Sequence, residues 1–255
     1  ENLTARSIII ETGDIISIDG TLTAWDYLEL NSARNVIVKG DIVAGDDNID
    51  KVVIMARGDK TVDVSIFDPV TNTYPILPQP SGYINIQALG MDSNNFEIRA
   101  KKDISIYLQS DFTISGYIGG VNGFDKAQNI TIQLVTKSLD NPATTVIENT
   151  PGVTYDVIDH QLTVTGGIVA AENTMVLQAG TIASDSSSVF ISTDLDAQTR
   201  NAMLLNTLVT TITAVSTVSG NVVINEADDL VINWISANNG GVAVTAGGSI
   251  TAHRV

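Results

Sequence analysis

The chain has no cysteine, few aromatic residues and few positive charges. Its 255 residues include 13 Lys and Arg against 29 Asp and Glu, which gives a formal net charge of −16. The absence of cysteine excludes disulfide scaffolds, thiol catalysis and cysteine-based zinc or iron–sulfur sites. The shortage of Lys and Arg argues against nucleic acid and anionic membrane surfaces as partners, because both bind clustered positive charge.

Long apolar runs are also missing. No stretch reaches 18 consecutive apolar residues, so the sequence predicts no transmembrane helix and no membrane insertion. Hydrophobic residues still make up 44% of the chain, which excludes a fully disordered protein. About a third of the residues are Ile, Val or Thr, and these branched side chains favour strands over helices.

Apolar and polar residues alternate over many short segments that are bounded by Gly, Asn or Asp. Clear examples are residues 62–66, 84–86, 104–106 and 130–132. Alternation with a period of two predicts strands with one buried face. The whole pattern indicates an all-β fold.

A corner motif recurs within this alternation. It consists of two alternating apolar residues, a glycine and another apolar residue two positions later. Copies lie at residues 16–24, 36–44, 112–120 and 162–170, and a relaxed copy lies at 242–252. The glycine lets the backbone turn sharply between two short strands. A spacing of about 20 residues is typical of solenoids.

We therefore predict an all-β, parallel β-helix (β-solenoid) with short strands, protruding loops and one short helix. Gly20 and Gly40 should occupy equivalent corners, with Ile18 stacked on Val38, and the fourth copy assigns Ile168 to an apolar position. An ordinary β-sandwich, or a pair of them, is the alternative, although a sandwich does not require this recurrence.

Asn or Asp precedes many of the segments. Such side chains bond nearby backbone in turns and can form ladders between stacked coils. The positions are Asn35, Asn85, Asn95, Asp103, Asp111, Asn129 and Asp229.

Three segments interrupt the repeats. Residues 68–80 hold four of the six prolines and predict a protruding loop, and residues 139–152 predict a second one. The third interruption is a predicted helix near residues 194–208. Its capping pattern is formed by Thr193 and Asp196.

The apolar face of this helix would consist of Ala202, Leu205 and Leu208, and we expect it to cover a coil face or an open sheet edge. The composition also changes near residue 150. We therefore expect one solenoid lobe at 1–150, with the proline-rich loop at 68–80, and a second lobe at 151–255 that carries the helix.

One acidic segment has the character of a calcium loop, so calcium is the one cofactor that the sequence suggests. Its candidate ligands are Asp46, Asp47, Asn48 and Asp50. An EF-hand would continue with Gly and Glu where this chain has Lys51 and Arg57, so the EF-hand pattern fails. A looser calcium site and a solvated acidic turn both remain open, as they do for Glu226, Asp228 and Asp229.

The tripeptide Arg57, Gly58 and Asp59 matches the sequence used for integrin recognition. It is a candidate adhesion site, because the strands expected on either side would place it in an exposed turn. The alternative is a turn made by Gly58 with two solvated charges.

Catalytic signals are sparse. We find no nucleophile elbow, zinc-binding helix, phosphate loop or dinucleotide fingerprint. His160 is most simply a surface or capped histidine. Six aromatic residues could stack on sugars or anchor loops: Trp25, Tyr27, Tyr74, Tyr83, Phe124 and Trp234. We predict that the chain is not an enzyme.

The glycine-cornered copies and the ending at residues 239–252 resemble repeats of very large bacterial exoproteins, and the nearest family is the filamentous-haemagglutinin-like β-helix adhesins. The resemblance covers about half of the chain, and the interruptions at 68–80 and 139–152 depart from the even repeats of that family. It implies a right-handed β-helix, export, and a structural or adhesive role without a cofactor.

Three functions follow as hypotheses. The first is a non-enzymatic, extracellular or bacterial cell-surface segment of a fibre, adhesin or matrix protein. The second is a polysaccharide-binding or polysaccharide-cleaving β-helix, which would show three or more converging carboxylates and a basic residue in a groove. The third is a self-assembling filament subunit. We expect the ends to pair with further coils of the same polypeptide or with the next subunit, and a cell-surface or carbohydrate ligand to be a further partner.

Overall fold

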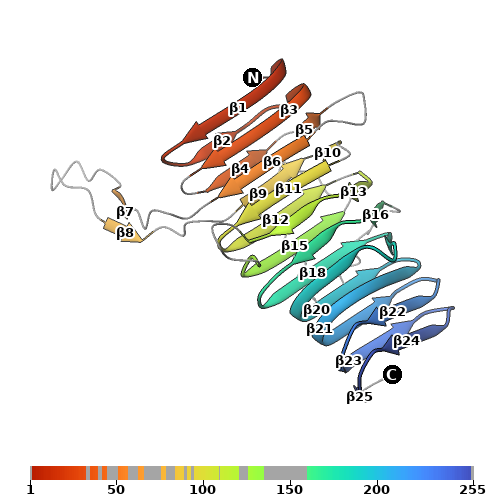
Figure 1. Ribbon diagram of the computed structural model, residues 1–255. Coiled ribbons are helices and arrows are strands. Elements are labelled where there is room, and N and C mark those ends of the chain that lie inside the picture. The colour runs from red at the N-terminus through yellow and green to blue at the C-terminus, as the bar shows by residue number, and fades with distance from the viewer. Residues whose placement is uncertain are drawn as a thin grey trace, which may run out of the picture.

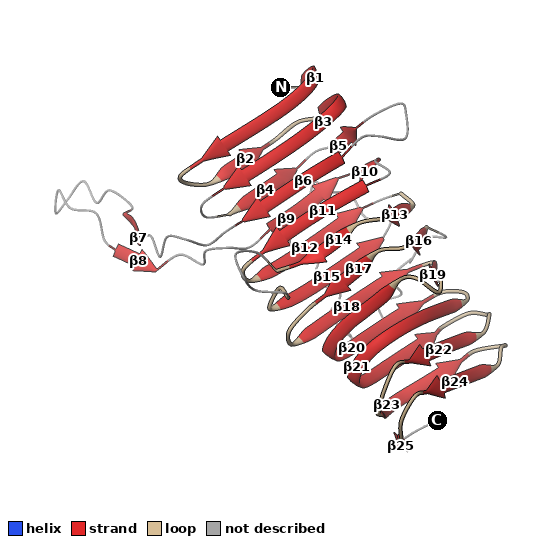
Figure 2. Ribbon diagram, viewed as in Figure 1, coloured by secondary structure: helices blue, strands red, loops and turns tan. Residues whose placement is uncertain are grey.

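The structure is a computed structural model that describes residues 2–32, 35–39, 42–44, 51–56, 63–65, 76–78, 84–88, 91–92, 95–108, 110–120, 126–134 and 160–253. Within these residues the chain is all β, and 23 strands form one sheet that winds into a solenoid (Figures 1 and 2). The described residues contain no helix, and so none that could cross a membrane. The predicted parallel β-helix is confirmed.

The solenoid has three walls, which follow one another along each coil. The first wall contains β5 (Ile42–Ala44), β10 (Met91–Asp92), β13 (Phe112–Ile114), β16 (Gln161–Val164), β19 (Thr181–Ser184), β22 (Val222–Glu226) and β24 (Val242–Ala246). The second wall contains β6 (Lys51–Ala56), β11 (Asn95–Ala100), β14 (Tyr117–Gly119) and β17 (Ile168–Ala170). The third wall contains β2 (Ile16–Ile18), β4 (Val36–Lys39), β9 (Ile84–Ala88), β12 (Asp103–Leu108), β15 (Asn129–Leu134), β18 (Thr174–Ala179), β23 (Leu230–Ala237) and β25 (Ile250–Ala252).

Four long strands run through more than one wall. β1 (Leu3–Thr12) and β3 (Leu22–Ser32) join the first wall to the second, and β20 (Val189–Thr199) joins the second to the third. β21 (Met203–Ser216) passes through all three.

The predicted alignment of the first two corner motifs is confirmed. Ile18 is the register partner of Val38, and Leu22 is the register partner of Ile42. Gly20 lies at the corner between β2 and β3, whereas Gly40 lies outside the described residues. The repeat of 20 residues in the sequence therefore corresponds to one coil of the solenoid.

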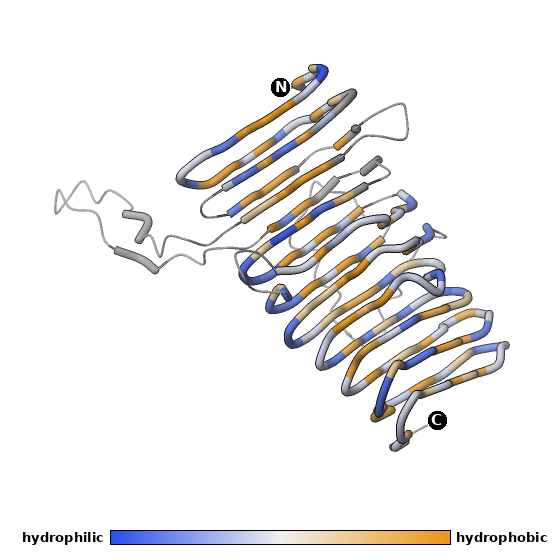
Figure 3. The backbone as a smooth tube through the Cα atoms, viewed as in Figure 1, coloured by the Kyte–Doolittle hydropathy of each residue, from blue (hydrophilic) through white to orange (hydrophobic). Residues whose placement is uncertain are grey.

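Aliphatic side chains stack in rows inside the solenoid, which explains the alternation in the sequence. Figure 3 shows how hydrophobic and hydrophilic residues follow one another along the coils. Along the third wall, neighbouring coils place Ile84, Ile104, Ile130 and Met175 on one another, and all four are fully buried. β-branched residues suit such rows because they pack well on a pleated surface.

The fourth copy of the corner motif has a longer corner than predicted. Ile168, expected inside, is 38% exposed, and Val169 is fully buried in its place. The strand register is consistent with this exchange of positions, since Ile118 of the preceding coil is the register partner of Val169 and not of Ile168. Gly166 has φ +66° and adds the extra residue to the turn. The motif therefore predicts the position of the corner correctly, but the corner is one residue longer than predicted.

The predicted helix near 194–208 is wrong, because these residues form the end of β20, the corner at 200–202 and the start of β21. The hydroxyl of Thr193 donates to the carbonyl of Glu172, one coil away, at 2.7 Å, so it does not cap a helix. Leu195 and Ala197 point into the core on top of Met175 and Leu177. Pairing with the neighbouring coil outweighs the local capping pattern.

The second wall ends before the other two. β22 is followed directly by β23 on the third wall, and the turn at 227–229 stands where earlier coils have a second-wall strand. Glu226 lies at this point, 5% exposed, and accepts a hydrogen bond from the Val209 N–H at 3.1 Å. The last coils therefore have two walls instead of three.

Polar side chains form the ladders that were predicted between coils. Asn129 donates to Asp103 at 2.8 Å, and these residues are register partners on β15 and β12. A glutamine ladder on the third wall was not predicted. In it Gln133 donates to Gln178 at 2.7 Å, and Gln178 donates to Gln198 at 3.4 Å. Both ladders run along the stacking direction and hold neighbouring coils in register.

Two strands lie apart from the solenoid. β7 (Asp63–Ser65) and β8 (Ile76–Pro78) form a separate antiparallel pair beside the stack (Figure 1). The rest of the predicted loop at 68–80, and the whole of 139–152, lie outside the described residues. The division into lobes at residue 150 stays a prediction, and β15 pairs directly with β18 across that gap.

Candidate functional site

The described residues contain a hollow of about 310 Å³ on the outer face of the second wall. It lies where β11, β14 and β17 are neighbours in the sheet. Two of its residues, Gly116 and Gly166, are corner residues without side chains, which leaves space between the coils. The other lining residues are Phe96, Glu97, Arg99, Tyr117 and Ile168.

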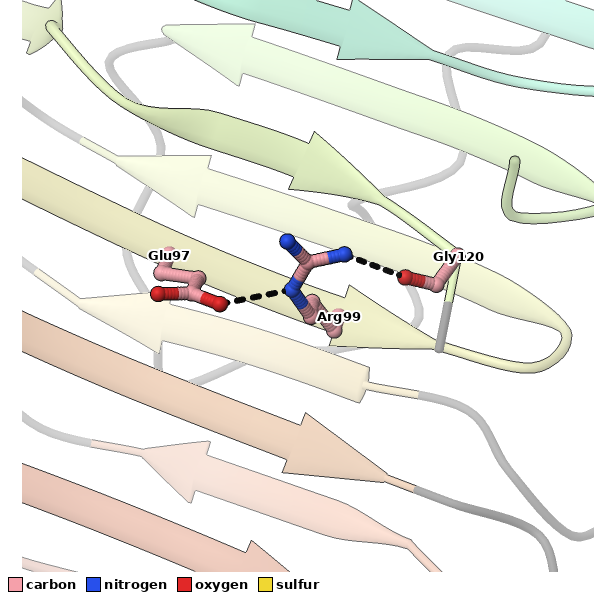
Figure 4. Close-up of polar contacts among 3 residues, drawn as sticks. All are labelled: Glu97, Arg99 and Gly120. Carbon is pink, nitrogen blue, oxygen red and sulfur yellow. Dashed lines mark hydrogen bonds and ion pairs between the residues drawn. The ribbon is translucent and has the colours of Figure 1, made fainter. Parts of the chain in front are cut away.

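Arg99 is held in place by three contacts, and Figure 4 shows the two that are hydrogen bonds, to Glu97 and Gly120. Its Nε–H donates to Oε1 of Glu97 at 2.7 Å, and its Nη1–H donates to the carbonyl of Gly120 at 3.0 Å. Its guanidinium carbon lies 4.2 Å from the centroid of the Tyr117 ring, which is a cation–π contact. Glu97 and Arg99 share one face of β11 because they are two residues apart on a strand.

Tyr117 lies along its own strand. A side chain at Gly119 would collide with the Tyr117 hydroxyl group, so the ring covers the backbone of Gly119. Gly119 therefore permits this position of the ring, and Arg99 packs on it from the neighbouring strand.

A second polar group lies on the same wall, nearer the N-terminus. The hydroxyl of Tyr27 donates to Oε2 of Glu29 at 2.7 Å. Burial, this hydrogen bond and the negative charges of Glu29 and Glu97 raise the pKa of Tyr27 to about 12. The phenol of Tyr27 is therefore neutral at physiological pH and donates its hydrogen bond to Glu29.

The hollow combines one carboxylate, one guanidinium, one phenol ring and one exposed aliphatic side chain. The carboxylate and the guanidinium neutralise each other, so the hollow has little net charge. The described residues contain no group of three His, Asp or Glu side chains that could hold a metal ion. The three converging carboxylates expected of a polysaccharide-cleaving groove are not present among the residues that line this hollow.

The sites predicted from sequence lie elsewhere in the chain. The candidate calcium ligands Asp46, Asp47, Asn48 and Asp50 fall outside the described residues, as does the candidate adhesion site Arg57, Gly58 and Asp59. Both stay predictions.

In the second acidic turn, at residues 226–229, the side chains of Glu226 and Asp229 accept hydrogen bonds from the backbone. Glu226 accepts backbone hydrogen bonds from Val209, Ala227 and Asp228. Asp229 accepts one from the N–H of Ser249, in the next coil, at 2.6 Å. His160 lies near Asp111, with Nδ1 and Oδ1 3.6 Å apart, on the first wall and away from the hollow.

Sequence reasoning missed Glu97, Arg99 and Tyr117. The signal was present as a Glu-x-Arg pair on one face of a strand and an aromatic residue directly after the glycine of a corner motif. Their proximity depends on which coils are neighbours, and the irregular spacing between the second and third copies of the motif hides this.

No family model matches this chain, and neither a curated protein nor a solved structure matches it.

Proposed function

We propose that the chain is a structural, non-enzymatic β-solenoid that forms part of an extracellular or bacterial cell-surface fibre, adhesin or matrix protein. Its terminal coils pair with further coils, either of the same polypeptide or of the next subunit. The unbroken parallel ladder of the third wall, from β2 to β25, supports an extended scaffold.

One observation carries this proposal. Val242 and Ile250 occupy core positions in the last coil, but they are 39% and 47% exposed. Their register partners in the coil before, Val222 and Leu230, are 0% and 1% exposed. A further coil would bury this apolar surface and would pair with the open edges of β24 and β25.

Analytical ultracentrifugation at micromolar concentration tests the proposal. We expect concentration-dependent, rod-shaped oligomers of the isolated chain. Val242→Lys combined with Ile250→Lys should abolish them, because a charge on this surface cannot be buried unpaired.

Thr245→Lys is the matched control, because Thr245 is exposed and alternates with the inward-facing positions of β24. It should leave the oligomers unchanged. A chain that is strictly monomeric up to the highest soluble concentration would contradict the proposal.

A further inference from the structure

We propose that the hollow formed by Glu97, Arg99, Tyr117 and Ile168 is a binding site for an uncharged saccharide. This goes beyond the scaffold role, and it does not depend on self-association. Saccharides present hydroxyl groups on their edges and C–H groups on their faces. A matching site must therefore offer fixed donors and acceptors beside an exposed apolar surface.

The polar part of the site is preorganised. Arg99 is fixed by Glu97, Gly120 and Tyr117, so little side-chain freedom is lost when a ligand binds. A guanidinium has five N–H donors, and among the described residues these contacts occupy only Nε and Nη1. The Nη2 group can then donate to a hydroxyl, while the carboxylate of Glu97 can accept from the neighbouring hydroxyl. Vicinal hydroxyls of a sugar ring fit this arrangement.

The apolar part lies beside it. Ile168 is 38% exposed because the longer corner at Gly166 turns this residue outward. It provides an apolar surface for the C–H face of a sugar, beside the Tyr117 ring that supports Arg99. The volume of about 310 Å³ suits one sugar residue or the end of a short oligosaccharide, at the lower end of small-molecule sites.

Charge selects against acidic ligands. The guanidinium is already paired with Glu97, so it offers no unopposed positive charge. The protein as a whole carries a formal charge of −16, which repels anions at a distance. We therefore expect neutral saccharides to bind and uronic-acid or sialic-acid saccharides of similar size to bind more weakly.

The test uses the full chain and two sets of probes. The first is a printed array of neutral, sialylated and uronic-acid-containing glycans. The second consists of free maltotriose, cellotriose and triacetylchitotriose, titrated by saturation-transfer NMR. We expect binding to neutral glycans, with a dissociation constant of roughly millimolar or tighter.

Three substitutions should each weaken this binding at least about tenfold, a loss of about 1.4 kcal/mol. Arg99→Gln removes the fixed donors, Tyr117→Ala removes the ring, and Ile168→Trp fills the hollow while leaving the polar pair in place. Gly119→Ala should weaken it as well, because it displaces Tyr117 without removing any lining side chain.

Tyr107→Ala is the matched control, because Tyr107 is a partly exposed tyrosine on the third wall, away from the hollow. It should leave binding unchanged, and thermal unfolding should show that all variants are folded. Absence of binding to every neutral glycan, preference for acidic glycans, or retained affinity in both Arg99→Gln and Tyr117→Ala would overturn the proposal. None of these outcomes bears on rod formation, so the two proposals fail separately.

Discussion

Glu226 shows how one side chain can end a wall of the solenoid. Where a strand lies at the edge of a sheet, its N–H groups need another acceptor. Oε2 of Glu226 accepts the N–H of Val209, while Oε1 accepts the N–H groups of Ala227 and Asp228 at 2.8 and 3.3 Å. A buried carboxylate thus takes the place of a strand, and the three backbone donors compensate for its burial.

Removing this carboxylate should destabilise the protein. For Glu226→Ala we expect a loss of about 2–3 kcal/mol in the free energy of unfolding, because the buried N–H of Val209 loses its charged acceptor. Urea denaturation at neutral pH measures this value. Asp228→Ala removes an exposed carboxylate two residues away and should change stability by less than about 0.5 kcal/mol. Equal effects of the two substitutions would contradict this role for Glu226.

Asp185 makes a corner of the solenoid sensitive to acid. Its carboxylate accepts hydrogen bonds from the Ser188 and Ser187 hydroxyls and from the backbone N–H groups of Gly166 and Ser187. The hydrogen bond from Ser188 is the largest of the causes that lower the pKa of Asp185 from 3.8 to about 2. The folded state therefore favours the charged form.

The pH dependence follows from the direction of this shift. A lowered pKa stabilises the fold fully above pH 3.8, and the contribution disappears as the pH falls through about 2. Asp185→Asn should therefore be less stable than the wild type at pH 6, and the difference should vanish near pH 2. Urea midpoints of both proteins at pH 6, 4, 3 and 2 measure it. A difference that does not change with pH would show that the carboxylate charge is not involved.

At the level of strands and corners, the sequence predicts regular coils well and irregular ones poorly. The sequence predicts that Ile18 stacks on Val38, because no insertion separates their coils. It does not predict the outward position of Ile168, because the corner before Ile168 is one residue longer than the motif. The helix near 194–208 was predicted from local capping signals, whereas its structure depends on a neighbouring coil. Such pairing is a non-local property.

The sequence does not predict the hollow, for a related reason. Arg99 and Tyr117 belong to consecutive second-wall strands, but the sequence repeat is irregular between residues 44 and 112. Without a coil alignment there, the sequence cannot show that they meet. The Glu97 and Arg99 pair could have been predicted, since alternation on a strand places both on one face.

Corners between coils leave little room for side chains. Substitutions at two adjacent glycines, Gly240 and Gly241, test this directly. A Cβ at Gly240 would collide with the carbonyl oxygen of Gly220 in the coil before, whereas a Cβ at Gly241 would meet only Asn221 Oδ1 at 3.6 Å. Gly240→Ala should cost about 1–3 kcal/mol of stability through overpacking. Gly241→Ala should change stability by less than about 0.5 kcal/mol. Thermal or urea unfolding compares the two, and equal stabilities would show that the corner relaxes freely.

For the whole molecule, the two ends have different cross-sections. The N-terminal coil has all three walls, with Leu3 on the first wall, residues 7–12 on the second and Ile16 on the third. In the described part of the C-terminal coil, β24 lies on the first wall and β25 on the third. If copies of the chain stack head to tail, the two coils can pair along two walls, and the second wall of the N-terminal coil finds no partner strand.

This mismatch makes the proposed end-to-end contact testable at the level of backbone amides. In oligomers, hydrogen exchange should slow in residues 242–252, 3–5 and 16–18, because these segments gain hydrogen bonds or become buried. Residues 7–12 should exchange at the same rate as in the monomer. Comparing hydrogen exchange by mass spectrometry at high and low protein concentration measures this pattern of protection. Raising the salt concentration should promote assembly, because subunits with a formal charge of −16 repel one another less when their charges are screened. Strong protection of residues 7–12 would show that the subunits associate through a different surface.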